Sequence, residues 1–181
     1  MNLEQLGLFL QITTCILHIF LSFNSPDFPE YFEDNLADWM KILNGVLDID
    51  LNLEGQNIFR SYIKMKTIGM RALNLYCTNY YDDISEYHNN FIGTVWKMLK
   101  YARTDIVYAK LVKQLLDYYK TLFQYNRTAN MFNQDAVQLL IDNLVIPNLQ
   151  LTSKELDDFE DNPINFTRIE LEEVDMDSSK I

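Results

Sequence analysis

The 181-residue sequence has little of the residues that make tight turns. It contains five glycines and four prolines, and a sheet protein with many hairpins needs more turn residues than that. Its two cysteines are too few for a disulfide framework, so a reducing compartment is the expected environment. These absences favour long helices over a many-stranded sheet.

Positive charge is also scarce, with 15 basic and 26 acidic residues and a net charge of −11. Non-specific nucleic-acid binding needs cations for phosphates, so nucleic acid is not an expected partner. The charge is unevenly placed: residues 1–59 carry net −8, residues 60–127 net +6 and residues 154–181 net −7. Such asymmetry indicates docking between parts of opposite sign, to a partner or within the chain, or separately solvated faces.

The residue groups that carry catalysis or hold metal are missing as well. Cys15 and His18 share a helix face, but no second pair of ligands follows, so both are expected in the core. His88 has no nucleophile or orienting acid nearby in sequence. No glycine cluster resembles a phosphate-binding loop. The sequence therefore predicts no catalytic residue, metal site or cofactor, and no enzyme.

The run from residue 6 to residue 23 is apolar enough to suggest a signal peptide or a membrane span. A signal peptide needs a positive start, yet residues 1–5 offer only Glu4 as a charge. Polar residues such as Gln11 and His18 interrupt the run, which a membrane span of about 20 residues rarely allows. We therefore expect a buried helix and no membrane insertion.

Apolar residues recur at helical spacing after this run. In the stretch 25–43, Asp27 and Glu30 have the spacing of a capping box at a helix start. The apolar stripe of that helix is Phe32, Leu36, Trp39, Met40 and Leu43. Trp39 and, further along, Trp96 fall on such stripes and should be largely buried.

The same periodicity predicts six helices, at residues 3–23, 29–47, 56–80, 84–102, 104–123 and 134–145. Asp82–Asp83 and Thr104–Asp105 are expected to cap the fourth and fifth, and Pro147 to stop the sixth. The helices form pairs at about 3–47, 56–102 and 105–146. Their spacing of about 50 residues is slightly longer than a HEAT repeat. The fold class is therefore all-α, a HEAT-repeat solenoid over residues 1–153 with an acidic segment at 154–181.

Several stretches resemble one known family in the same order and spacing. They are PEYFEDNLADWM at 29–40, IGTVWKML at 92–99, VIPNLQL at 145–151 and FEDNPINFTRIELEEVDMDSSK at 159–180. These are similar to segments of the importin-α re-exporters, nuclear export receptors of the importin-β superfamily that include the cellular apoptosis susceptibility protein. The family's arginine-rich pattern after FEDNP is reduced here to Arg168 and Lys180.

The resemblance implies a HEAT-repeat superhelix that wraps around Ran in its GTP form together with importin-α. It implies a receptor that is not an enzyme and shuttles between nucleus and cytoplasm. In the family, the segment after FEDNP begins a central, insertion-bearing repeat that contributes to Ran and cargo contacts. The candidate partner-binding residues are accordingly Arg168, Glu170, Glu172, Glu173 and Asp175. The alternatives are an importin-β superfamily transporter with another cargo, a plain helical scaffold, and a membrane-tethered helical domain.

Overall fold

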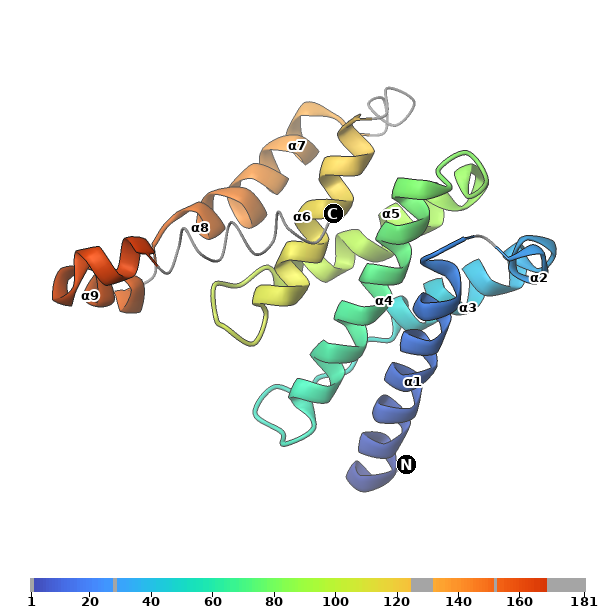
Figure 1. Ribbon diagram of the computed structural model, residues 1–181, viewed down its shortest axis with the longest axis horizontal. Coiled ribbons are helices and arrows are strands. Elements are labelled where there is room, and N and C mark those ends of the chain that lie inside the picture. The colour runs from blue at the N-terminus through green and yellow to red at the C-terminus, as the bar shows by residue number, and fades with distance from the viewer. Residues whose placement is uncertain (1, 28, 125–131, 152, 169–181) are drawn as a thin grey trace.

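The computed structural model describes residues 2–27, 29–124, 132–151 and 153–168. Over these residues the chain is helical, and no strand occurs (Figure 1). The α-helices are α1 (Leu3–Asn24), α2 (Glu30–Asp34), α3 (Leu36–Asp48), α4 (Phe59–Asn79), α5 (His88–Lys97), α6 (Ala109–Gln124), α7 (Gln134–Leu140), α8 (Ile146–Leu149) and α9 (Ser153–Asp161). Short 3₁₀ turns, η1 (Ser85–Tyr87) and η2 (Met98–Tyr101), flank α5. The all-α prediction is confirmed.

The helices form two layers with α4 at the centre. Helices α1, α4 and α6 lie side by side in one layer (Figure 1), and α3 and α5 pack together in the second. Helix α4 contacts α1, α6 and α3. The chain then continues through α7 and α8 to α9, which lies at the far end of the molecule from α1 and α2 (Figure 1). This is the arrangement of a HEAT-like solenoid.

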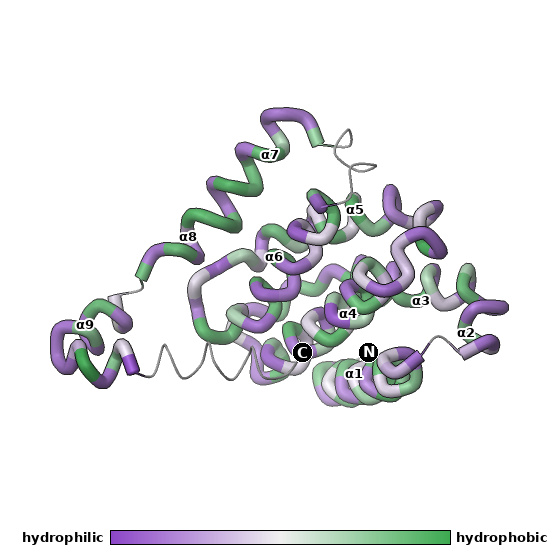
Figure 2. Tube along the Cα trace, turned by 45° about the horizontal axis from the view of Figure 1, so that its top comes forward, coloured by the Kyte–Doolittle hydropathy of each residue, from purple (hydrophilic) through white to green (hydrophobic). Residues whose placement is uncertain are grey.

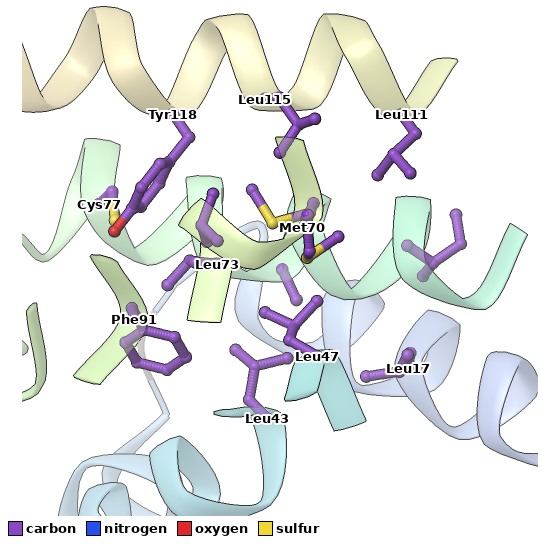
Figure 3. Close-up of a cluster of buried hydrophobic side chains, with 14 of the residues drawn as sticks. Leu17, Leu43, Leu47, Met70, Leu73, Cys77, Phe91, Leu111, Leu115 and Tyr118 are labelled. Atoms are coloured by element: carbon purple, nitrogen blue, oxygen red, sulfur yellow. The ribbon is translucent and has the colours of Figure 1, made fainter. Parts of the chain in front are cut away.

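Helix α4 forms the core because apolar residues cover most of its circumference. Tyr62 and Tyr76 are fully buried on it, and the side chains of Met70 and Leu73 lie between α3, α5 and α6 (Figure 3). Gly69 lets α3 approach closely, since a Cβ there would lie 2.9 Å from Leu47 Cδ2. The two tryptophans pack against this core from α3 and α5 and are partly buried.

The predicted helix over 29–47 is split in two. Helix α2 begins after Pro29, which makes no side-chain cap, so the Asp27–Glu30 capping box is wrong. The helix breaks at Asn35, where φ is −113° and the side-chain amide donates to the Tyr31 carbonyl at 2.8 Å. Asparagine competes for backbone hydrogen bonds in this way and favours helix ends.

Three other boundaries differ from the prediction. Asp82–Asp83 and Thr104–Asp105 lie in turns, so α5 begins four residues and α6 five residues later than predicted. Pro147 does not stop the sixth helix, because it lies in the first turn of α8, where proline is tolerated. The preceding segment, Ile141–Val145, widens into a π turn, which accommodates the missing proline N–H.

Helix α1 packs one side against α4 and leaves the other uncovered. Leu10, Leu17 and Phe20 are buried, whereas Cys15 and His18 are exposed, so placing those two in the core was wrong. The uncovered side carries six large apolar residues: Leu8, Phe9, Ile12, Ile16, Ile19 and Phe23. Figure 2 accordingly shows hydrophobic residues on both sides of α1. Among the described helices, α1 alone is long and apolar enough to span a membrane.

Replacing a core leucine of α4 tests this packing. Leu73 has no exposed surface, so Leu73→Ala should lower the free energy of unfolding by about 2–5 kcal/mol because it leaves a cavity. Leu149→Ala is the matched control: its side chain is 79% exposed, and the cost should stay within about 0.5 kcal/mol. Urea denaturation followed by circular dichroism measures both. Equal costs for the two variants would contradict the assignment of the core.

Candidate partner-binding surfaces

Arg168 is the one predicted site residue that the described part of the chain contains. It lies exposed in a helical stretch that begins at residue 163, and its guanidinium donates to Asn165 Oδ1 at 2.9 Å. Asn162 starts this turn by accepting from the Asn165 backbone N–H at 3.1 Å, and Pro163 follows at the first helical position. The FEDNP motif is thus a helix-start signal. Glu170, Glu172, Glu173 and Asp175 lie outside the described residues.

The acidic segment folds back on itself between α9 and this helical stretch. Phe159 on α9 meets Phe166 edge-on, with ring centroids 5.7 Å apart. The acidic side chains of α9 are exposed: Asp157, Asp158, Glu160 and Asp161. The aromatic pair holds α9 against the helical residues that follow Asn162, and the exposed side chains of α9 make its surface negative.

A second charged surface lies where the loop after α3 meets the end of α5. Three ion pairs join the two parts: Lys97 to Asp48 at 2.7 Å, Lys100 to Asp50 at 2.6 Å and Arg103 to Glu54 at 2.5 Å. We call these six side chains the charge ladder. The partners are 49 or 50 residues apart, which matches the repeat spacing predicted from sequence. Docking between oppositely charged parts of the chain therefore occurs here.

A cleft of about 370 Å³ opens beside the charge ladder. Its wall contains Phe59, Tyr101 and Tyr108, and the last two rings stack with centroids 6.3 Å apart. The ammonium of Lys100 holds the pKa of Asp50 below its usual value, so that carboxylate stays ionised at neutral pH. The cleft offers aromatic faces with fixed charges at its rim, which suits a protein side chain and has no catalytic geometry.

Sequence reasoning missed Lys66, a buried cation on the apolar face of α4. Only 2% of this residue is exposed. Its ammonium donates to the backbone carbonyls of Val46, Leu47 and Ile49 at the end of α3. These carbonyls have no partner within the helix, and a cation suits the negative end of its dipole. The signal was a lysine at helical spacing among buried residues.

The described residues contain no cluster of three or more metal-ligating side chains. His88 is buried with its ring 4.3 Å from that of Tyr81, and burial lowers the pKa of the imidazole. Cys77 is also buried, and burial raises the pKa of its thiol to about 12, so it stays protonated. Neither group is placed to act as a nucleophile or a base.

Comparison with known proteins identifies the family. The family model described as Cse1 matches residues 1–180. The chain belongs to the Cse1 family. This match spans both layers of helices, the charge ladder and the FEDNP turn.

Three relatives illustrate the match. Exportin-2 of Oreochromis niloticus is 26% identical over 92% of this chain. The importin alpha re-exporter of Saccharomyces cerevisiae is 26% identical over 99%, and the importin-alpha re-exporter of Schizosaccharomyces pombe 29% identical over 97%. The matched region is 18% or 19% of the length of these relatives.

The buried Lys66 makes the stability of the chain depend on pH. Burial lowers the pKa of Lys66 from 10.5 to about 8, although the carboxylates of Asp50 and Asp48 oppose the shift. Between these values the unfolded state binds more protons, so Lys66 makes the free energy of unfolding rise with pH. Relative to Lys66→Met, the wild type should gain about 1–3 kcal/mol from pH 7.5 to pH 10.

Urea denaturation at each pH measures this difference between wild type and Lys66→Met. The titration of Cys77 and of the buried tyrosines cancels, because both proteins contain these residues. Lys64→Met is the matched control, since Lys64 is an exposed lysine on the same helix. Its free energy of unfolding should change with pH in parallel with that of the wild type. A Lys66→Met curve that also runs parallel would contradict the lowered pKa of Lys66 in the folded chain.

Proposed function

We propose that the chain is part of a nuclear export receptor that binds importin-α together with Ran in its GTP form. The receptor returns importin-α to the cytoplasm and shuttles between the two compartments. The observation that carries the proposal is the Cse1 match over residues 1–180, with relatives named exportin-2 and importin-alpha re-exporter. A transporter with another cargo is less well supported, because its relatives would carry other names.

The physical character of the chain supports a binding role without catalysis. Helical repeats provide long surfaces, and here these surfaces carry separate charges. We assign residues 1–153 to the repeats and residues 154–181 to the start of a partner-contacting segment. A surface of this kind recognises proteins through shape and charge, so the receptor is not an enzyme and needs no cofactor.

A binding experiment with the full-length receptor tests the proposal. Immobilised receptor should retain importin-α in the presence of Ran loaded with a non-hydrolysable GTP analogue. Ran loaded with GDP should retain far less, because cooperative binding couples the two ligands. Retention that is equal with both nucleotides would contradict the export cycle. Retention of another karyopherin cargo in place of importin-α would favour the alternative transporter.

Charge reversal in the acidic segment tests the predicted partner-binding residues. Changing Glu170, Glu172, Glu173 and Asp175 together to Lys should slow assembly of the receptor with Ran and importin-α by about tenfold, since complementary charges mainly accelerate association. The effect should shrink at high salt. Stopped-flow fluorescence measures the association rate.

A matched variant controls for net charge alone. Changing Glu30, Glu33, Asp34 and Asp38 to Lys alters the charge equally, at α2 and the start of α3. The assembly rate of this control should stay within about twofold of wild type if the acidic segment makes the contact. Equal slowing in both variants, or no slowing in either, would show that the acidic segment does not contact a partner.

A further inference from the structure

The outer surface of the α1–α4–α6 layer contains a polar groove of about 480 Å³. It lies between the carboxyl-terminal half of α4 and that of α6, and the end of α1 closes one side. We call it the polar groove. The residues used below are Arg71 and Asn74 from α4 and Gln114, Asp117 and Lys120 from α6. The groove shares no lining residue with the charge ladder or with α9.

The cations of this groove differ from those of the charge ladder. Lys97, Lys100 and Arg103 each bind a carboxylate of the chain. Arg71 and Lys120 are exposed, and neither has an ion pair with any residue that the structure describes. Both cations of this groove are therefore available to a ligand that brings its own negative charge.

Amide groups lie between the two cations. The Asn74 side-chain amide donates to the Gln114 backbone carbonyl at 2.9 Å and to Gln114 Oε1 at 3.1 Å. The Oε1 atom of Gln114 is thereby occupied, so the Nε2 group is the part left for a ligand. Side-chain amides of this kind pair well with a peptide backbone, as in strand-type peptide recognition.

The groove residues have a defined order along the helix axes. Helices α4 and α6 run parallel, since Phe59 contacts Tyr108 near their starts and Asn74 contacts Gln114 further along. Arg71 lies before this second contact and Lys120 beyond it, and a rise of about 1.5 Å per helical residue separates them by about 13 Å along the helix axes. Asp117 falls between them. The charge order along the groove is therefore positive, negative, positive.

We propose that the polar groove binds an extended peptide segment of a partner protein with the charge order acidic, basic, acidic. An extended chain that runs along the groove advances about 3.3 Å per residue, so about four residues span the axial offset between Arg71 and Lys120. Residues i, i+2 and i+4 of such a strand point to the same face. In a peptide with Glu at i and i+4 and Lys at i+2, the first Glu thus meets Arg71 and the second meets Lys120. The Lys between them meets Asp117. A continuous phosphate chain fits less well, because Asp117 repels it.

Fluorescence anisotropy with labelled peptides tests the proposal on the 181-residue chain. The peptide SESKSES should bind, whereas the charge-reversed SKSESKS should bind about tenfold more weakly or not at all. Arg71→Glu combined with Lys120→Glu should weaken SESKSES by about tenfold or more. The matched control, Lys64→Glu with Lys110→Glu, makes the same charge change at exposed sites outside the groove and should stay within about threefold.

A charge swap gives a second readout that does not depend on loss of binding. Asp117→Lys should bind SESESES more tightly than the wild type does, because the central acid then meets a cation. Circular dichroism melting confirms that each variant is folded. Three outcomes would overturn the proposal. They are an equal loss of peptide affinity in the two double variants, no gain in affinity for SESESES in Asp117→Lys, and binding of a single-stranded RNA of uridines as tight as that of SESKSES.

Discussion

The carbonyl groups that end α3 point into the protein, where one buried ammonium group satisfies them. Lys66 reaches them from α4, and one turn earlier the Tyr62 hydroxyl donates to the Ile49 carbonyl at 2.8 Å. Together these side chains hold the end of α3 against α4. This contact fixes the direction in which the following loop leaves α3. The following loop then brings Asp50 and Glu54 against the next repeat. Without the buried cation, the carbonyls of Val46 and Leu47 would lose this partner, at a cost of about 1–3 kcal/mol for each one left unpaired.

The charge ladder depends on this geometry. Exposed ion pairs contribute about 0–1 kcal/mol each, so three of them cannot set the stability of the fold. They can set its register, because acids on one loop and bases on the next repeat pair correctly at only one offset. The stability comes instead from burial around α4, where Gly69 allows α3 to approach and leucines of α3 and α6 fill the space between the layers.

The sequence predicts this architecture well wherever periodicity is the signal. The bounds of α1 and α4 lie within about three residues of prediction, because a long apolar stripe constrains where a helix can run. Single capping and helix-breaking residues predicted the helix boundaries less well. Asp82–Asp83 and Thr104–Asp105 also suit turns, and Pro147 is tolerated in a first turn, so tertiary packing decided each case. Lys66 escaped prediction because its partners are backbone carbonyls, which no sequence pattern displays. Of the predicted site, the structure describes Arg168 alone, and the roles of the four acids stay a prediction.

The distribution of charge between surfaces has a consequence for binding. The bases of the charge ladder are held by acids of the same chain, and those acids are not available to a partner. The acids of α9 and the cations of the polar groove, Arg71 and Lys120, lie on separate parts of the molecule. Because the Debye length is about 8 Å at physiological salt, two such surfaces act independently. Under the two binding proposals above, these surfaces would engage ligands of opposite charge at the same time, and neither ligand would have to displace the other.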